Sequence, residues 1–284
     1  MMRRGFALLA VLWTLTAVTV FTGAALAVAR VGSQTTRNRI LLARAAWARE
    51  ACVEILQARY AADPSVRRID SVDLGRNSWC NATLKDPSSK LNLNVADRQA
   101  LADVLQSVVR RSSAVDSLAD ALLDWRDPDT LRRPFGEESP RNRNGPLADI
   151  WELHYVRGFT DSLIASLSLF LTTRGTGVIN VNAAPREVLA VLPGMTDEAV
   201  QVLMTRRGGG AVDNPDAFAA LLSPSSRAVL LASYPEFVRA TVFSAPQFIG
   251  VVAGGVRGTP LVARVTLTMV PVAARLAVIR RETE

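Results

Sequence analysis

Histidine is almost missing from this chain, because His154 is the one histidine among 284 residues. It lies among aromatic and aliphatic neighbours, which favours a packing role over one as a base or a metal ligand. The sequence also has no Gly-x-Ser-x-Gly elbow, no phosphate loop and no Cys/His pair at zinc spacing. Carboxylate pairs such as Asp124 and Asp127 leave glycoside hydrolysis open only in principle. We therefore predict that the protein is not an enzyme.

Lysine and cysteine are also scarce. Lysine occurs only at positions 85 and 90, so the net charge of +7 comes almost wholly from arginine. The arginines are scattered, and no run of five like charges marks a patch for nucleic acid or anionic lipid. Cys52 and Cys80 are the only cysteines, and in an oxidising compartment they could form a disulfide. Cys52 lies among apolar residues of a predicted helix, so a buried free thiol is the alternative.

Charge is absent from Phe6 to Ala29, and this uncharged segment is long enough to span a bilayer. Arg3 and Arg4 precede it without a nearby acid, which favours a cytoplasmic N-terminus. The rest of the protein would then lie on the far side of the membrane. A cleaved signal peptide is the alternative, because Ala25-Leu26-Ala27 fits a signal peptidase site. The apolar run is, however, longer than an ordinary signal core of about 7–15 residues.

The residues before the apolar run carry a more specific signal. Arg3-Arg4-Gly5-Phe6 places basic residues and a glycine before Phe at the head of a long apolar helix. This arrangement resembles the leader of type IV prepilins. The resemblance implies that a prepilin peptidase cuts between Gly5 and Phe6 and leaves the helix attached to the mature protein.

The helix is predicted to continue beyond the membrane. No Pro or Gly occurs from Thr35 to Ala62, and Asp63-Pro64 then ends the helix. An apolar stripe at three- to four-residue spacing comprises Leu41, Ala45, Ala48, Cys52 and Leu56. Such a stripe must pack on another element, and in a pilin that element is a small antiparallel sheet.

The pattern after the helix changes twice. Strands are predicted at Ser71–Leu74, Ser78–Leu84 and Lys90–Val95, and again at Phe237–Phe243, Leu261–Val270 and Ala274–Arg280. Helices are predicted between these groups, at Asp97–Val109, Ala114–Trp125, Leu147–Tyr155, Thr160–Leu171, Ala184–Leu192, Thr196–Arg206 and Asp216–Leu222. Thr160 and Thr196 are the expected N-caps of two of them. A helical domain inserted into one sheet explains this order with the fewest assumptions.

Four motifs in this order resemble those of the type II secretion minor pseudopilin K family. They are Lys90-Leu91-Asn92-Leu93-Asn94, the stretch from Asp120-Ala-Leu-Leu-Asp124 to Glu138, Asn144-Gly145-Pro146 with Val156-Arg157-Gly158, and Val178-Ile179-Asn180-Val181-Asn182. The resemblance implies an α+β fold with a pilin-like helix, an antiparallel sheet and a large helical domain inserted between strands. The implied parts are a leader (1–5), a transmembrane helix (6–29), its amphipathic continuation (30–62), the sheet (63–95 and 236–284) and a helical insert related to SAM and helix-hairpin-helix domains (96–235).

The resemblance also implies a place in an assembly. The expected role is that of a minor pseudopilin at the tip of the pseudopilus, anchored in the bacterial inner membrane with its C-terminal domain in the periplasm. Its expected partners are the pseudopilins I and J, with the H-type and major pseudopilins below, and the prepilin peptidase. Ala10 stands at the fifth mature position, where most pseudopilins carry a glutamate that pairs with the N-terminal amine of the next subunit. A chain without that acid cannot receive a subunit in this way.

An acidic cluster is the candidate metal site. Its members are Asp124, Asp127, Asp129, Glu137 and Glu138. Carboxylates gathered in a loop suit Ca²⁺, which takes six to eight oxygen ligands, and the K family holds calcium around matching acids. Ser139 departs from the family pattern, since an acid is usual there. The nearby arginines, Arg126, Arg132 and Arg133, could neutralise the acids instead of a metal.

Two alternatives stay open from the sequence. A K-like minor pilin of a related type IV filament would have the same architecture. Leu192-Pro193-Gly194-Met195 before Thr196 also resembles a helix-hairpin-helix turn, which binds DNA phosphate through backbone N–H groups. Asp197 and Glu198 would repel phosphate from that helix start, so a membrane-anchored DNA-binding protein is the less favoured reading and nucleic acid is an unlikely partner.

Overall fold

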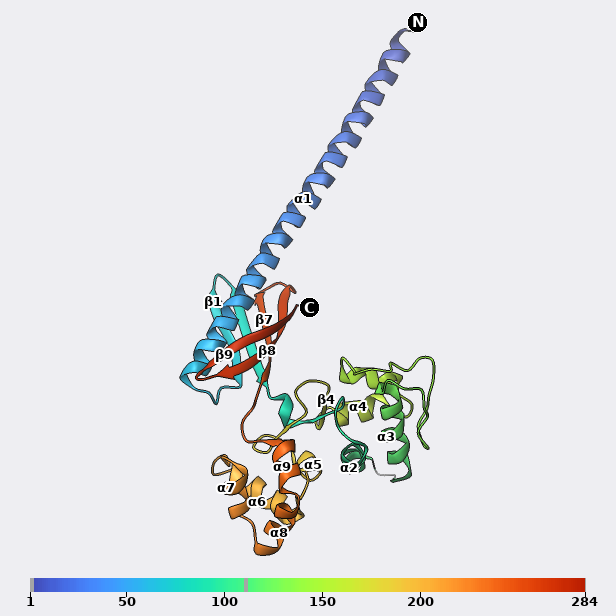
Figure 1. The fold of residues 1–284 in the computed structure, drawn as a ribbon. Helices are drawn as coiled ribbons and strands as arrows, with labels where there is room; N and C mark the ends of the chain where they lie inside the picture. The colour runs from blue at the N-terminus through green and yellow to red at the C-terminus, as the bar shows by residue number, and fades with distance from the viewer. Residues whose placement is uncertain (1–2, 110–111, 284) are drawn as a thin grey trace. The chain divides into compact units, whose positions relative to one another are not determined.

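The computed structural model describes residues 3–109 and 112–283, and the chain separates into two compact units (Figure 1). The first unit contains the chain up to Thr83 together with residues 251–267 and 281–284. The second unit contains residues 84–250 and 268–280. The fold is α+β, with a long helix, a five-stranded sheet and a helical unit placed in the chain between the second and third strands of that sheet.

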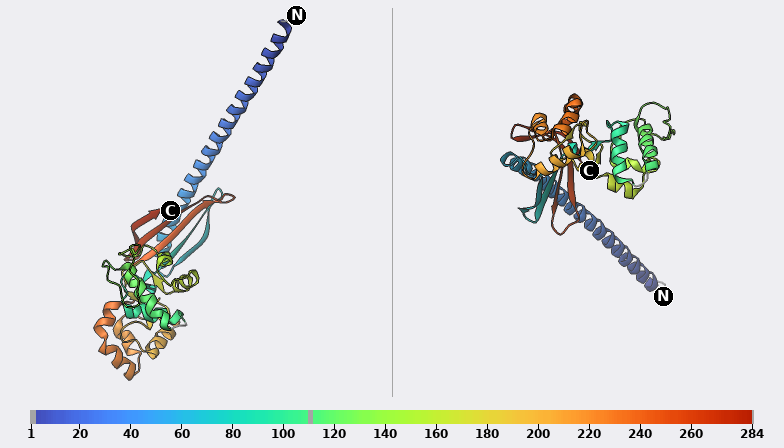
Figure 2. Two further views of the ribbon diagram at one scale, coloured as in Figure 1. Left: turned by 90° about the vertical axis from the view of Figure 1, so that its right-hand side faces the viewer. Right: turned by 90° about the horizontal axis from the view of Figure 1, so that it is seen from below.

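The first element is α1 (Arg3–Ala62), a single helix of 60 residues. Its N-terminal half has no strand beside it, and residues 8–40 are all exposed (Figure 2). Among the described residues, α1 is the helix that is long and apolar enough to cross a membrane. It is therefore compatible with a single-pass membrane anchor. The predicted stripe on its second half is buried at Ala45, Ala48, Cys52 and Leu56.

The sheet has the strand order β1-β2-β7-β8-β9. Its strands are β1 (Arg68–Gly75), β2 (Ser78–Lys85), β7 (Phe248–Val256), β8 (Val262–Val272) and β9 (Arg275–Thr283). β1 pairs antiparallel with β2, and the register shifts twice along this edge pair. Arg76 and Asn77 join the two strands in a turn with positive φ at both residues. Such a turn matches the twist of a hairpin.

Gly254 lets α1 lie directly against β7. A Cβ atom at this position would lie 2.3 Å from the backbone nitrogen of Arg49 and 2.8 Å from the carbonyl oxygen of Ala45. Both atoms belong to the helix backbone, so no side-chain rotation would make room. A disulfide between Cys52 and Cys80 joins the same helix to β2, with their Cα atoms 5.8 Å apart. The helix is thus fixed to the sheet by backbone contact and by a covalent bond.

The second unit contains two segments of the same design. In the first segment, β3 (Leu91–Asn92) pairs in parallel with β4 (Leu171–Thr172). In the second, β5 (Ile179–Asn180) pairs in parallel with β6 (Thr241–Val242). The first segment carries α2 (Arg98–Val108), α3 (Ser112–Arg126), the 3₁₀ helix η2 (Ile150–Tyr155) and α4 (Asp161–Leu167). The second carries α5 (Arg186–Leu189), α6 (Asp197–Arg207), α7 (Pro215–Ala220), α8 (Pro224–Ala232) and α9 (Tyr234–Ala240).

One asparagine occupies the centre of each segment. The Asn94 side chain donates to the Leu147 carbonyl at 2.9 Å and accepts from the Leu147 N–H at 2.7 Å. The Asn182 side chain, 88 positions later, donates to the Val212 carbonyl at 2.7 Å and accepts from the Val212 N–H at 2.9 Å. Each amide also donates to a carbonyl just past the second strand of its own segment. The two networks are therefore equivalent.

An arginine at the end of one helix completes each segment. Arg126 ends α3 and donates to the carbonyls of Leu93 and Ala96. Arg207 ends α6 and donates to the carbonyl of Ala184, the position equivalent to Ala96. Burial lowers the pKa of both guanidinium groups. We conclude that the helical unit is an internal duplication of one helical hairpin and its strand pair.

The structure corrects three sequence predictions. The residues Lys90–Val95 do not join the main sheet, because Leu91 and Asn92 pair with β4 inside the helical unit. Most of the predicted strand Phe237–Phe243 belongs to α9, and only β6 follows it. The strand β7 was not predicted, because its glycines interrupt the alternation of apolar and polar residues that indicates a strand. The helical segment consequently extends beyond the predicted bounds of 96–235, from β3 at Leu91 to β6 at Val242.

The predicted helices were mostly right in place, whereas their lengths differ: α3 is longer than predicted, α6 has the predicted length and the others are shorter. Each predicted helix corresponds to one helical element, although Leu147–Tyr155 is a 3₁₀ helix that begins only at Ile150. The two predicted caps are confirmed, because Thr160 accepts from the Leu163 N–H and Thr196 accepts from the Ala199 N–H. The helix α8 was not predicted.

Candidate functional site

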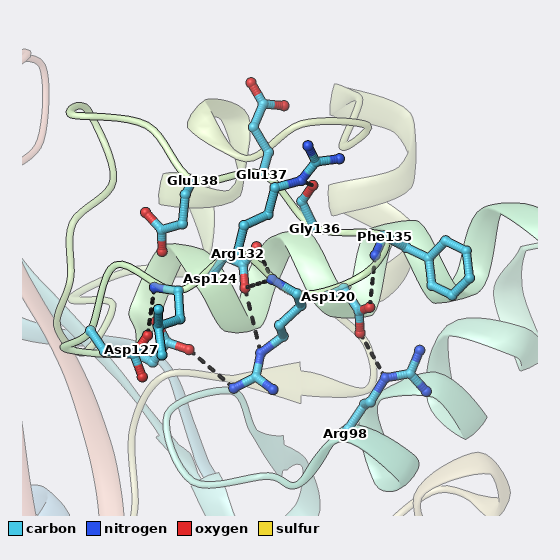
Figure 3. Close-up of polar contacts among 12 residues, drawn as sticks. Arg98, Asp120, Asp124, Asp127, Arg132, Phe135, Gly136, Glu137 and Glu138 are labelled. Carbon is cyan, nitrogen blue, oxygen red and sulfur yellow. Dashed lines mark hydrogen bonds and ion pairs between the residues drawn. The ribbon is translucent and has the colours of Figure 1, made fainter.

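The acidic cluster lies where α3 meets the loop that follows it. α3 supplies Asp120 and Asp124, whose side chains are almost completely buried, and Asp127 follows the end of the helix. The loop then turns back over the helix and brings Glu138 to the same side, whereas Glu137 points away from the other acids (Figure 3). The first two carboxylates are therefore internal groups of the fold, not parts of a solvated surface.

Asp120 and Asp124 hold the loop through its backbone. The Phe135 N–H donates to Asp120 Oδ2 at 3.2 Å, and the Arg133 N–H donates to both oxygens of Asp124 at 3.2 and 3.3 Å. Gly136 passes so close that a Cβ atom there would lie 2.0 Å from Asp124 Oδ2. Any side chain at this position would displace the buried carboxylate. The glycine in this motif is thus explained by the packing of Asp124.

Arginines neutralise part of the cluster. Arg98 Nε lies 2.6 Å from Asp120 Oδ1. Arg133 Nη2 lies 3.0 Å from Asp127 Oδ2, and its Nε lies 3.5 Å from Asp124 Oδ1 (Figure 3). Arg126 and Arg132 make no ion pair with these acids, because their guanidinium groups donate to backbone carbonyls, although Asp127 is close enough to Arg126 to favour its charged form. Arginine thus neutralises part of the negative charge, as the alternative to a metal supposes, and Arg133 is the residue that pairs with two of the predicted acids.

Negative charge remains in excess around Arg133. Burial raises the pKa of the Asp124 carboxyl, and the nearby Asp127 raises it further. Burial also raises the pKa of Glu138, and the charges of Asp124 and Asp127 add to that effect. Both carboxyl groups therefore hold a proton more strongly than an exposed acid does. A cation bound nearby would instead stabilise their ionised forms.

Three buried oxygens of this part of the chain have no hydrogen-bond donor among the residues that the structure describes. They are Asp127 Oδ1, Glu138 Oε1 and Asn144 Oδ1. A buried acceptor without a donor is costly, and it indicates water or an ion. Carboxylate and amide oxygens are the ligands that calcium prefers. Within the described ranges, however, no group of three or more His, Cys, Asp or Glu side chains is arranged to hold a metal ion by itself.

The five predicted acids therefore divide. Asp124, Asp127 and Glu138 act on one another. Asp129 accepts from the Leu131 N–H at 2.8 Å, and its charge adds a smaller contribution to the raised pKa of Glu138. Glu137 pairs with Arg157 at 3.1 Å. Sequence reasoning missed Asn144, which has a left-handed backbone at φ 50°. The Asn-Gly pair at Asn144-Gly145 is a turn signal that could have drawn attention to it.

The second repeat has the same design without acids at these positions. Its helix α6 is equivalent to α3 with an offset of 81 positions, taken from Arg126 and Arg207. At that offset Asp120, Asp124 and Asp127 correspond to Gln201, Thr205 and Gly208. The connecting loop also differs, since 21 positions separate Arg126 from Leu147 and only 5 separate Arg207 from Val212, a difference of 16. The acidic loop is an addition to the first repeat.

The remaining predicted sites are simple to place. Gly5 and Phe6 lie in the first turns of α1. At the helix-hairpin-helix turn, Gly194 has the left-handed backbone that such a turn needs, with φ 73°. Glu198 accepts from the hydroxyls of Ser223 and Ser226 at 2.8 and 2.6 Å. The start of α6 is therefore occupied by an acid of the protein itself, which disfavours phosphate there.

Comparison with known proteins gives one consistent result. Two profiles described as "Type II secretion system (T2SS), protein K" match residues 81–175 and 179–234. The chain is also similar to a protein in the crystal structure of the GspK-GspI-GspJ complex from the type 2 secretion system of enterotoxigenic Escherichia coli. That similarity has a TM-score of 0.67 at 17% identity and covers 90% of this chain and 99% of the other. No curated protein sequence matches.

Proposed function

Since the chain belongs to the protein K family of the type II secretion system, we propose that it is the minor pseudopilin that caps the tip of the pseudopilus and helps to start its assembly. Its work would be assembly for protein secretion across the outer membrane, not catalysis. The observation that carries the proposal is Ala10 on α1. The apolar segment has no carboxylate at this or any other position from Phe6 to Ala29.

The physical reason concerns charge in lipid. An ionised carboxylate inside a bilayer is costly unless a partner neutralises it. In a filament of pilin-like helices, the partner is the free N-terminal amine of the neighbouring subunit. A subunit with Ala10 offers no such partner, so another subunit gains nothing by stacking on it. Its position at one end of the filament follows.

The exposed surface of α1 supports membrane anchoring. Large apolar side chains on the first half of the helix are more than half exposed, including Leu8, Trp13, Phe21 and Val28. Lipid or apolar partner helices must cover this surface, because the exposure of so large an apolar area to water is unfavourable in free energy. With the prepilin peptidase acting between Gly5 and Phe6, the first half of α1 would remain in the inner membrane and the sheet and the helical unit would lie in the periplasm.

The partners we propose are the pseudopilins I and J, with the H-type and major pseudopilins below. The similar solved chain belongs to a GspK-GspI-GspJ complex, which is the basis for naming I and J. On α1, Gly23 has nothing within 4 Å of its Cβ position, and Ala24, Ala25 and Ala27 follow it. Small residues allow helix backbones to approach closely in lipid, where dispersion replaces the hydrophobic effect.

Coexpression tests the proposed place in the assembly. The full-length chain is coexpressed with the I and J subunits of the same cell and is purified in detergent through a tag on one partner. All three chains should copurify in fixed ratio. Gly23→Leu should reduce the recovered complex, whereas Leu12→Ile, a change of shape alone on an exposed position, should not. Recovery of the K chain without I and J would contradict the proposal.

We propose in addition that the acidic loop holds a calcium ion. The three buried oxygens of Asp127, Glu138 and Asn144 that lack donors support this, together with the excess of negative charge beside Asp124. A bound cation would neutralise that charge and fix the loop to α3. Arg133 would share this work, since it already pairs with two of the carboxylates.

A further inference from the structure

The added loop of the first repeat builds a pocket of about 450 Å³. One wall comes from loop residues Glu137, Ser139, Arg141 and Asn142. The other lining residues are those at the end of η2 and in the turn after it, at 154–159, together with Ala121 and Trp125 of α3. The second repeat has only a short connection where this loop stands. The pocket therefore depends on the same long loop as the acidic site, and Asn142 belongs to both, since its side chain donates to Glu138 Oε2 at 3.3 Å.

Trp125, Tyr155 and Phe159 form an aromatic part of an otherwise mainly polar lining. Trp125 is 9% exposed and stacks on Tyr155, with ring centroids 6.2 Å apart and an interplanar angle of 13°. Tyr155 is 75% exposed, so an aromatic face remains open to solvent. The indole N–H of Trp125 is buried and has no acceptor among the described residues. Because this atom is not accessible to solvent, a ligand would change its signal through the stacked Tyr155 ring and not by direct contact.

The charges of the pocket are unbalanced. Arg157 is held in place, because it pairs with Glu137 at 3.1 Å and donates to the Phe135 carbonyl at 3.1 Å. His154 Nδ1 lies 3.1 Å from Asp161 Oδ1. Arg141 is exposed, and its guanidinium has no hydrogen bond or ion pair with any described residue. One positive charge of the lining is thus without a counterion.

We propose that this pocket binds a carboxylate group that carries an aromatic or apolar neighbour, such as an acidic segment of another exported or periplasmic protein. Arg141 would pair with the carboxylate, the exposed face of Tyr155 would contact the apolar part, and Trp125, stacked on Tyr155, would sense the bound ligand. An arginine fork and an aromatic face suit a carboxylate beside an apolar group. The inference does not depend on the place of the protein in a filament.

The indole signals of the full-length chain test this inference. The chain has five tryptophans, so ¹⁵N-indole labelling in detergent gives few signals, and Trp125→Phe identifies the relevant one. Three dipeptide probes are added: acetyl-Asp-Phe amide with a side-chain carboxylate, acetyl-Asn-Phe with a terminal carboxylate, and acetyl-Asn-Phe amide with neither. At least one carboxylate probe should shift the Trp125 signal, and the one that does identifies the kind of carboxylate. The neutral probe should not shift it, and the Trp79 signal should stay fixed.

A charge variant completes the test. Arg141→Gln should weaken binding of the carboxylate probe roughly tenfold or more, because a charge-assisted pair is lost. Arg275→Gln removes an exposed arginine from β9 and should leave binding unchanged. Unshifted indole signals in the free variants would show that both still fold. The inference is overturned by equal shifts from the neutral probe, by no shift at saturating carboxylate, or by full affinity in Arg141→Gln.

Discussion

Gly254→Ala should detach α1 from the sheet more effectively than any change of a side chain in the interface. The new Cβ would lie 2.3 Å from the Arg49 nitrogen, 2.7 Å from the Ala48 carbonyl carbon and 2.8 Å from the Ala45 oxygen. Unstrained contacts need about 3.4 Å or more, so the helix backbone and β7 must separate by about 1 Å. At that separation the apolar stripe of α1 (Ala45, Ala48, Cys52 and Leu56) loses packing contacts with the sheet.

The expected cost follows from known effects of overpacking. Insertion of one methyl group into a close-packed interface costs about 1–3 kcal/mol, and contact with backbone on three sides places this case at the upper end. A loss of about 3 kcal/mol lowers Tm by roughly 6–12 °C for a domain of about 150–250 residues. Thermal unfolding of the full-length chain in detergent, followed by the fluorescence of its tryptophans, measures this shift. Trp79 packs on the neighbouring Gly255 and reports on the same region.

Gly32→Ala is the matched control. It lies on the same helix and has nothing within 4 Å of its Cβ position. Its alanine variant should melt at the same temperature or slightly higher, because alanine favours the helix by up to about 1 kcal/mol. If both variants melted like the parent protein, the close contact between α1 and β7 would not exist in solution.

Three further predictions concern the leader, the acidic loop and the tip. Gly5→Val should block peptidase processing while the chain still enters the membrane, because a Cβ obstructs a narrow protease site. N-terminal sequencing of the mature parent protein should begin at Phe6. A start near residue 28 or 30 would indicate an ordinary signal peptide. Calcium should raise Tm by mass action, and Asp127→Asn with Asp129→Asn should abolish the rise; an unchanged melt with saturating calcium and with chelator would leave the cluster without a metal. Ala10→Glu should leave secretion equal or weaker, since the new acid has no partner amine, and its occurrence at regular intervals along filaments would refute the tip position.

The pH dependence of stability has a defined sign at the acidic loop. Burial raises the pKa of Asp124 above its ordinary value of 3.8, so the folded state holds the proton more strongly than the unfolded chain. In chelator, stability should therefore rise as the pH falls through that raised pKa towards 3.8. Calcium should oppose this trend, because a cation favours the ionised form. Melting curves at several pH values, with and without calcium, measure both effects, and identical curves would contradict the assignment.

The sequence predicted the elements whose signals are local. The uncharged run and the stripe from Leu41 to Leu56 predicted α1, and Asp63-Pro64 predicted its end at Ala62. Threonine caps located α4 and α6. The helical insertion was predicted from a change in the period of the hydrophobic residues, a signal that is visible in the sequence without knowledge of tertiary contacts.

Elements fixed by distant contacts were not predictable in this way. The strand β7 contains Gly250, Gly254 and Gly255, which weaken its pattern, and the need for Gly254 appears only when α1 lies on it. The duplication was also missed, because the two Asn-x-Asn motifs are short and the loops between their helices differ in length. At the site, the sequence named the right acids but gave no sign that Arg133 would pair with two of them while Glu137 would pair elsewhere.

The duplicated design has a consequence for how the helical unit unfolds. Each repeat depends on the segment that leads into the other: Asn92 donates to the carbonyl of Gly175 at 2.9 Å, and Asn180 donates to Asp86 Oδ2 at 2.7 Å. The two loops meet where a Cβ on Gly175 would lie 3.2 Å from Pro87. Neither repeat can lose its strand pair without leaving a buried amide of the other unsatisfied. The two halves should therefore unfold in one cooperative step, and neither repeat expressed alone should be stable.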